Sequence, residues 1–414
     1  MNKYKLGDIS EIQSGPFGTQ LHKDEYVPEG IPMLNSKNIG NGIVVEDSLD
    51  FVPEDVCERL PRYILKKGDI LFGRAGTIER HTYVDSKYDG CFQGTNCIRI
   101  RCEDKQKSRY ISYYLWLNKL KVKIENAAGG SIQSYITTDL LKDIEVEIPD
   151  DYEKRANFLF LIDEKIHNNN QINDNLEQQL MLLYDYWFTQ FDFPDNTGSP
   201  YQTSGGKMVW NDTLKRNIPE NWKVQSVISN SLSSIIKPGV EIFNTKTYLA
   251  TADVKGTSIS TGTIVDYDGR ESRANMQPSI NSVWFAKMKN SIKHLYLNKE
   301  MHPIISNSVL STGFCGLQCN EISFEYIASY VSNAYFEIYK DMLAHGATQE
   351  AVNNDDLAGV HIIIPKDTVL RAYHEATQFI YAQISKNICE NRELVKLRDW
   401  LLPMLMNGQA TISD

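Results

Sequence analysis

The segment from residue 152 to residue 190 constrains the fold of this chain most, because it contains neither proline nor glycine. As one helix of about 38 residues it would be roughly 57 Å long, far beyond the average globular helix. Its core-facing positions step by four and three residues, which is typical of a coiled-coil seam. These positions are Ile162, Ile166, Asn169, Asn173, Leu176, Leu180, Leu183 and Trp187. Such a seam predicts a second long helix as its partner.

The partner helix is predicted near the end of the chain, from about Thr368 to Leu405. An offset of about 218 residues turns the seam into Ile380, Ile384, Asn387, Asn391, Leu394, Arg398, Leu401 and Leu405. Both asparagines recur, and only Leu180 becomes polar, as Arg398. A buried Asn costs stability but specifies register, because its amide needs a partner across the seam. We therefore expect two paired helices with Asn169, Asn173, Asn387 and Asn391 as register residues. The alternative is two unrelated amphipathic helices, each packed on its own domain.

A second repeat lies immediately before each long helix. Residues 130–149 (GSIQSYITTDLLKDIEVEIP) align without gaps with residues 346–365 (GATQEAVNNDDLAGVHIIIP). Each copy predicts a glycine-containing loop, a short helix or turn, and an alternating strand that ends at proline. Shorter matches link residues 4–9 with 222–227, 33–39 with 248–254, and 66–76 with 281–290. The chain is therefore predicted to be a duplicated unit with a pseudo-two-fold axis.

The duplication predicts an α+β fold, in which two mixed α/β domains are each followed by a long helix and the two helices pack on each other as a coiled coil. Between the halves lies a stretch rich in Pro, Gly, Ser, Asn and Thr, which is typical of a linker or surface wrap. The predicted boundaries are 1–150 for the first domain, 151–191 for the first helix, 192–219 for the linker, 220–366 for the second domain, and 367–414 for the second helix and tail.

Charge is unevenly distributed along the chain. The formal net charge is −10, and residues 151–198 hold 3 basic and 9 acidic residues, whereas residues 1–150 hold 20 and 23. An acidic helix would not lie along nucleic-acid phosphates, so basic loops on the domains would have to make any such contact. No run of about 18 apolar residues predicts a membrane span, and the first residues lack a signal-peptide core. We expect a cytoplasmic protein.

Motifs for catalysis or cofactor binding are missing. The sequence has no Walker A motif, no GxSxG, no dinucleotide fingerprint and no HExxH. The seven cysteines form no CxxC pair, and Cys315 and Cys319 lack a second ligand pair, so zinc is not expected. Histidines such as His81, His345 and His361 are equally compatible with core or surface roles. We expect a non-catalytic chain with no cofactor and no metal.

Polar loops on both halves carry residues suited to nucleic-acid recognition. Arginine pairs with guanine, Asn and Gln pair with adenine, and Lys, Ser and Thr suit phosphates. Each loop alone is also compatible with a solvated turn. The candidates in the first half are Ser36, Lys37, Asn38, Arg74, Thr77, Arg80, Gln93, Thr95, Asn96, Ser131 and Gln133. Those in the second half are Thr251, Lys255, Arg270, Arg273, Asn275, Gln277, Thr312, Thr348 and Gln349.

Several stretches resemble one known family. They are residues 184–222 (YDYWFTQFDFPDNTGSPYQTSGGKMVWNDTLKRNIPENW), residues 397–409 (LRDWLLPMLMNGQ), the Gly-Asp-Ile-Leu of residues 68–71, and the repeated segment before each helix. The full chain resembles the specificity subunits of Type I restriction–modification systems. The second half departs from the pattern, with Ser-Val-Trp-Phe at 282–285 in place of Gly-Asp-Ile-Leu.

The resemblance implies that each domain is a target recognition domain that reads one half of a bipartite, asymmetric sequence in double-stranded DNA. The helices would pack as an antiparallel coiled-coil spacer and set the spacing between the half-sites. Two modification subunits, which bind S-adenosylmethionine and methylate adenine, would dock on the helical region, and two ATP-dependent restriction subunits would join them. The chain itself would be non-catalytic.

Two other classes of function stay open from the residues alone. A duplicated scaffold that binds only proteins would suit the acidic charge, and salt-dependent DNA binding would argue against it. A stand-alone methyltransferase–nuclease is disfavoured by the missing motifs, and methylation by the isolated chain would support it.

Overall fold

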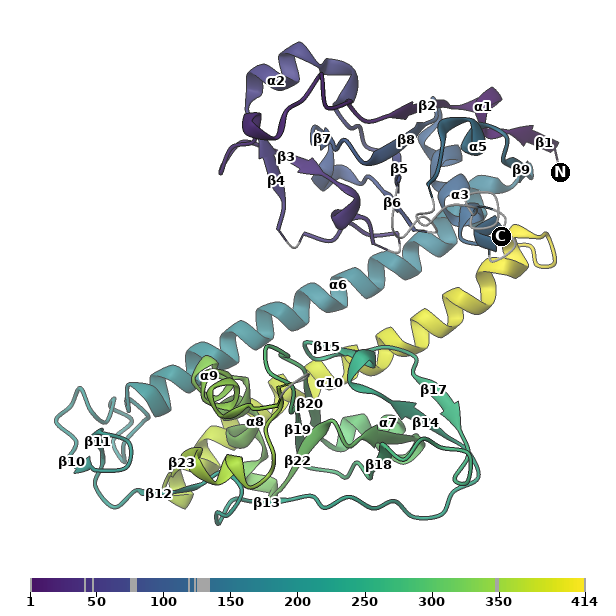
Figure 1. The fold of residues 1–414 in the computed structure, drawn as a ribbon. Coiled ribbons are helices and arrows are strands. Elements are labelled where there is room, and N and C mark those ends of the chain that lie inside the picture. Colours follow the sequence, from purple (N-terminus) through teal and green to yellow (C-terminus); the bar gives the residue numbers. More distant parts are fainter. Residues whose placement is uncertain are drawn as a thin grey trace. The chain divides into compact units, whose positions relative to one another are not determined.

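The computed structural model describes residues 2–40, 42–46, 48–74, 80–117, 120–122, 124, 135–346 and 350–412. The chain forms two compact units (Figure 1). The first consists of residues 1–163 and 397–414, and the second of residues 164–396. Each unit therefore contains a mixed domain together with parts of both long helices.

The two long helices of the sequence prediction are present. Helix α6 runs from Tyr152 to Tyr184 and continues as a π-helical turn over Asp185–Thr189. Helix α10 runs from Asp367 to Met406, with Pro403 in its last turn. The π-helical turn at the end of α6 was not predicted, because the sequence of residues 185–189 is compatible with an ordinary α-helix. Within each unit the two helices run antiparallel, as their contacts show.

In the second unit the seam asparagines bond across the helix pair. The Asn169 Nδ2 donates to Asn391 Oδ1 at 2.9 Å, and the Asn387 Nδ2 donates to Asn173 Oδ1 at 2.8 Å. Asn169, Asn173 and Asn387 are buried, so their amides need these partners. The exposed flank adds an ion pair between Lys165 and Glu390 at 3.1 Å. That the asparagines specify the register stays a prediction.

The Asn173–Asn387 pair provides a direct test of that prediction. We expect Asn387→Leu to lower the free energy of unfolding by about 1–3 kcal/mol, because the buried Asn173 amide loses its partner. The double variant Asn173→Leu/Asn387→Leu should recover most of that stability, since two apolar groups then meet in the seam. Chemical denaturation measures both changes. Equal losses in the single and double variants would contradict the pairing argument.

The first domain is built on three small sheets. Their strand orders are β1-β9, β2-β8-β5-β6 and β4-β3-β7, with β3 and β7 parallel. The strands are β1 Asn2–Lys5, β2 Glu11–Ser14, β3 Ile31–Leu34, β4 Asp50–Val52, β5 Ile70–Gly73, β6 His81–Tyr83, β7 Phe92–Gln93, β8 Cys97–Arg101 and β9 Glu145–Ile148. The helices are α1 Leu6–Ile9, α2 Glu54–Arg59, α3 Lys105–Leu115 and α5 Thr138–Lys142.

The Gly-Asp-Ile-Leu motif of this domain has a structural role. Gly68 has φ +102°, a conformation that favours glycine, at the turn into β5. The buried Asp69 carboxylate accepts two bonds from the Arg101 guanidinium, at 2.7 and 2.6 Å, and one from the Lys66 amide at 2.8 Å. Ile70 and Leu71 are fully buried. The motif therefore joins β5 to β8 rather than contributing to a binding surface.

The end of α10 completes the core of the first unit. Leu402, Leu405 and Met406 are buried in one cluster with Leu6 and Ala156. Asp163 of α6 accepts hydrogen bonds from the Tyr113 hydroxyl at 2.5 Å and from the Arg398 guanidinium at 2.9 Å. One side of this part of the helix pair therefore packs on α3.

The second domain repeats the plan of the first. Its strand orders are β12-β23, β13-β22-β19-β20 and β17-β14-β21-β18, with β14 and β21 parallel, and β15-β16 forms a further pair. The strands are β12 Lys223–Ser226, β13 Ser233–Ile235, β14 Lys246–Leu249, β15 Val254–Lys255, β16 Ser258–Ile259, β17 Thr263–Val265, β18 Ala274–Met276, β19 Ser282–Ala286, β20 His294–Leu297, β21 Ser308–Ser311, β22 Phe314–Cys319 and β23 His361–Ile364. The helices are α7 His302–Asn307, α8 Phe324–Ser332 and α9 Ala334–Leu343.

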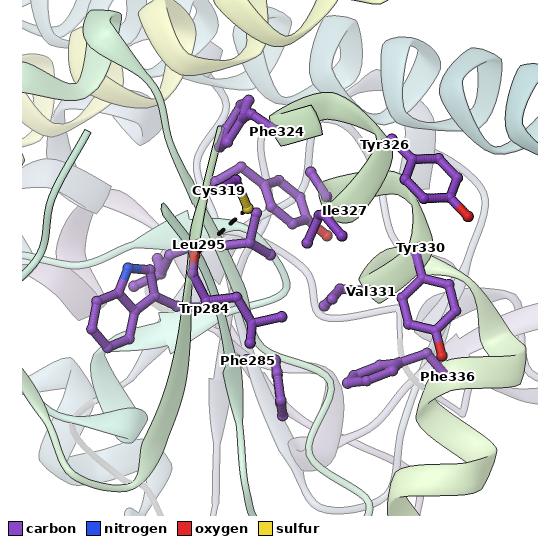
Figure 2. Packing of buried hydrophobic residues seen from close by; sticks show 14 of the residues in the cluster. Trp284, Phe285, Leu295, Cys319, Phe324, Tyr326, Ile327, Tyr330, Val331 and Phe336 are labelled. Carbon is purple, nitrogen blue, oxygen red and sulfur yellow. Dashed lines mark hydrogen bonds between the residues drawn. The ribbon is translucent and has the colours of Figure 1, made fainter. Parts of the chain in front are cut away.

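Aromatic residues dominate the core of this domain (Figure 2). Trp284 and Phe285 of β19 are fully buried, and Phe285 meets Phe336 of α9 edge to face at 4.8 Å between ring centroids. The Ser-Val-Trp-Phe stretch that replaces Gly-Asp-Ile-Leu is therefore a central strand.

The stretch between the two halves is more ordered than the linker that its composition predicts. It contains a hairpin of β10 (Met208–Asn211) and β11 (Arg216–Pro219). Phe193 and Trp222 stack at 4.9 Å in the core of the second unit. The hairpin was missed because turn-forming residues flank both of its strands.

Candidate nucleic-acid interface

A polar hollow of about 690 Å³ in the first unit brings together five of the predicted residues: Ser36, Lys37, Arg74, Thr95 and Asn96. They lie on separate segments of the chain, after β3, after β5 and after β7. The hollow is also lined by Pro16, Phe17, Gly18, Leu21, His22, Lys23, Tyr26, Asn35 and Asp50. With one carboxylate among several cationic side chains, its lining favours an anionic ligand.

The backbone near β3 and β7 holds this lining in place. The Arg74 amide donates to the Asn96 carbonyl at 2.8 Å, so the Arg74 and Thr95–Asn96 segments are adjacent. A Cβ on Gly94 would lie 2.0 Å from Asn35 Oδ1, and one on Gly15 would lie 2.0 Å from Gly94 O. Both positions therefore require glycine. The segments that carry the polar side chains are fixed by close backbone packing.

Asp50 organises the charge at the edge of the hollow. Its carboxylate accepts from Lys37 Nζ at 3.0 Å and from Asn35 Nδ2 at 2.8 Å. Burial, followed by the neighbouring Asp50 charge, raises the pKa of Tyr26, so its hydroxyl stays protonated as a hydrogen-bond donor. Lys37 is held by an exposed ion pair that a phosphate could displace at little cost.

Two predicted contact residues of the first half point inward instead. Asn38 is fully buried, and its amide donates to the Val45 carbonyl at 2.9 Å. Gln93 is also fully buried, and its Nε2 donates to the carbonyls of Gln13 at 3.0 Å and Cys97 at 3.2 Å. Both side chains tie neighbouring segments together, and we do not propose them as contacts. Arg80 is exposed.

Sequence reasoning missed the segment that forms one wall of the hollow, residues 16–26. Its basic members His22 and Lys23 are followed directly by Asp24 and Glu25, so the charge pattern did not single them out. The only signal was an aromatic residue inside a Pro-Phe-Gly turn at 16–18.

In the second unit three predicted residues come together. The Thr312 amide donates to the Arg273 carbonyl at 2.9 Å. Thr251 lies in a short 3-10 helix, and a Cβ on Gly313 would be 2.9 Å from its methyl group. Arg273 is exposed. Thr251 follows β14, as Ser36 and Lys37 follow β3 in the first unit, whereas Arg273 precedes β18 and Thr312 follows β21.

The other predicted residues of this unit are partly used by the protein itself. The Arg270 guanidinium donates to the Ala274 carbonyl at 3.1 Å and lies 3.9 Å from the centroid of the Tyr267 ring. Gln277 Oε1 accepts from Lys246 Nζ at 3.1 Å. Asn275 is half-buried in β18, and Lys255 is exposed in β15. Thr77, Ser131, Gln133, Thr348 and Gln349 lie outside the described residues.

The long helices carry a second kind of exposed surface, which is apolar. In the first unit, Asp163 and Arg398 point toward α3, where the Arg398 guanidinium lies 5.4 Å from the Trp116 ring centroid. Leu161 and Trp400 lie two residues from this pair, roughly 200° around each helix, and so point away from the domain. They are 65% and 61% exposed. We call Leu161 and Trp400 the first patch.

The sequence repeat produces the same surface in the second unit. Tyr381 points toward the domain, where its hydroxyl bonds Ser329 at 2.8 Å, and Leu180 is buried in the core. Phe379 and Leu182, again two residues away, are 75% and 72% exposed. An offset of 218 residues relates Leu161 to Phe379 and Leu182 to Trp400. Phe379 and Leu182 form the second patch.

Among the described residues no group of three or more His, Cys, Asp or Glu could hold a metal ion. No described helix is long and apolar enough to cross a membrane. The described residues that favour a binding function lie in the polar hollow, in the cluster near Thr251, and in the apolar patches.

Comparison with known proteins shows what the chain is similar to. Residues 1–178 match the model of the Type I restriction modification DNA specificity domain. The MjaIX specificity subunit of Methanocaldococcus jannaschii is 24% identical, over 99% of this chain and 93% of the relative. The HindI specificity subunit of Haemophilus influenzae is 23% identical, over 98% and 99%. The crystal structure of a Type I system S subunit from M. genitalium has the same fold, with a TM-score of 0.54, 15% identity, and coverage of 100% of this chain and 96% of that one. The chain is therefore similar along nearly its whole length to specificity subunits of Type I restriction–modification systems, and its first 178 residues match their DNA specificity domain.

Proposed function

We propose that this chain is the DNA-recognition subunit of a Type I restriction–modification complex, with each domain reading one half of a bipartite, asymmetric target. The observation that carries the proposal is the hollow of the first unit. It gathers a lysine, an arginine, an asparagine and two hydroxyl side chains from distant segments onto one concave surface. These groups are the ones that contact phosphates and base edges.

Within the hollow we assign different roles to different side chains. Lys37 and Ser36 suit phosphate contacts, because a flexible ammonium and a hydroxyl bind oxygen without sequence preference. Arg74 and Asn96 suit base edges, since each offers a planar, two-pronged hydrogen-bonding group. In the second unit, Arg273, Thr251 and Thr312 form the corresponding set. The acidic net charge of the chain is compatible with this role because most of its excess lies in residues 151–198, outside the hollow.

Substitutions in the hollow test the assignment. We expect Arg74→Ala to weaken binding of the assembled complex to its target by about 1–3 kcal/mol and to relax specificity at one base pair of one half-site. Lys37→Ala should weaken binding to all duplexes alike and reduce the salt-dependence slope by about one. Fluorescence anisotropy over a salt series measures both. The exposed Lys3, paired with Glu147 at 3.3 Å, provides a matched control. Unchanged binding in both variants would contradict the DNA interface.

We further propose that the two apolar patches dock two modification subunits, one on each patch. Exposed Trp and Phe side chains are typical of interface centres. Because the patches are related by the repeat, two copies of one partner fit them equally well. Two restriction subunits would then join through the modification subunits, and the whole complex would act in the cytoplasm.

The helices would set the number of base pairs between the half-sites. Paired asparagines and the Lys165–Glu390 ion pair hold α6 and α10 together, so the pair would act as a stiff spacer. One turn of DNA is about 34 Å, a length that such helices exceed. A scaffold that binds only proteins would have the patches but would have no use for the basic hollow.

A further inference from the structure

We propose that Phe17 is an apolar wedge that stacks on a base at the edge of the first half-site. The inference rests on the proposed DNA-reading function of the hollow and adds a contact of a different chemical kind. All the contacts argued above are polar. Phe17 lines the same hollow with its ring 58% exposed.

The turn that carries Phe17 is held by hydrogen bonds of one residue, Gln20. The Phe17 amide donates to Gln20 Oε1 at 3.2 Å, and the Gln20 amide donates to the Phe17 carbonyl at 2.8 Å. Gln20 Oε1 also accepts from the Tyr63 hydroxyl at 2.9 Å, and its carbonyl accepts from Arg59 at 2.8 Å. Single exposed apolar residues are common on protein surfaces. This one is fixed in an exposed position by a network that reaches two other segments.

The neighbours of the ring favour a nucleic-acid base as its partner. Lys37 and Arg74 line the same hollow and would hold the backbone and base edges of a duplex beside it. Proteins that distort DNA insert Phe, Leu or Ile between base steps while cationic residues hold the flanking phosphates. Stacking of a base on an aromatic ring is favourable and tolerates any base, whereas a ring left in water gains nothing.

The second domain also has an exposed apolar residue after the corresponding edge strand, which supports a function for such a residue. Strand β13 is the edge strand of the sheet β13-β22-β19-β20, as β2 is of β2-β8-β5-β6. The loop after β2 holds Pro16, Phe17 and Gly18, and the loop after β13 holds Pro238 and Gly239 and leads to Ile242. Ile242 is 84% exposed. An exposed apolar side chain therefore follows the same edge strand in both domains.

The test uses the chain assembled with its modification subunits and a target duplex with 2-aminopurine placed at successive positions of each half-site. The target is first defined from the methylation pattern of cells that express the chain. We expect binding to raise the 2-aminopurine fluorescence at one position of one half-site, because the ring unstacks a base there. Phe17→Ser should abolish that rise and weaken binding about tenfold without changing the salt slope. Phe17→Trp should retain both.

The controls separate failure of the wedge from failure of the DNA interface. Tyr4→Ser removes another exposed aromatic ring of the first unit and should change neither readout, and thermal melting should show all the variants folded. Retention of the fluorescence rise and affinity by Phe17→Ser, with binding still lost in Arg74→Ala and Lys37→Ala, would overturn the wedge alone. Unchanged binding in all three variants would overturn both proposals.

Discussion

Introducing charge into both apolar patches should abolish methylation by the assembled complex. We expect Leu161→Glu/Trp400→Glu to weaken docking of one modification subunit at least about 100-fold, because truncated interface aromatics commonly cost more than 2 kcal/mol and a buried carboxylate adds a desolvation penalty. The complex should then hold one modification subunit instead of two. Adding Leu182→Glu/Phe379→Glu should leave none. Native mass spectrometry counts the subunits, and methylation of the target measures activity.

The design of this experiment separates docking from folding. Leu161, Trp400, Leu182 and Phe379 are all more than 60% exposed, so their substitution should leave the melting temperature within a few degrees of the original. Ile292→Glu, at a 63% exposed position of the second unit outside the long helices, is a matched control. Full occupancy by two modification subunits in the fourfold variant would show that the partners bind elsewhere.

Exchange of the first domain should change one half of the recognised sequence and nothing else. We expect a chimaera that carries residues 1–150 of another family member to keep the second half-site and the spacer length while it acquires a new first half-site. Sequencing of methylated bases in cells that express the chimaera determines the two half-sites and the spacer length at once. A change in both half-sites would contradict the assignment of one domain to one half-site.

The structure also shows which contacts with the long helices such a donor domain must supply. The incoming domain has to pack against α6 and the end of α10, which the recipient supplies. In this chain Tyr113 bonds Asp163, and Trp116 lies over Arg398. A donor that lacks these two aromatic residues should give an unstable chimaera, which thermal melting detects. The reciprocal exchange of residues 220–366 is the matched control and should alter only the second half-site.

Regular periodicity made the helices and the duplication predictable from the sequence. A seam with period 3.5 can be satisfied only by a long helix with a partner, so α6 and α10 were expected within a few residues of where they lie. The segments before each helix form equivalent strand pairs, β1-β9 and β12-β23, because they keep the same alternation. The order of the central strands was not predictable, since it depends on pairing between distant segments.

The candidate contact residues were harder to predict because the same side chains serve structure and recognition. Lys37 and Asn38 are adjacent in one loop, yet the Lys37 side chain is exposed at the hollow and the Asn38 side chain is fully buried. Composition cannot distinguish them, because the direction of each depends on the backbone of a short 3-10 helix. Phe17 was not predicted as a contact residue, because an apolar side chain is ordinarily expected to be buried in the core.

The contribution of α10 to the first core has a consequence for how the protein is made. Most of the first unit leaves the ribosome early, yet Leu402, Leu405 and Met406, which fill its core, are translated last. Domains generally fold in the order in which they emerge, and here the earlier unit must wait for the end of the chain. We therefore expect the first unit to reach its full stability only after α10 has been translated, so a chain cut short before residue 397 should expose this core.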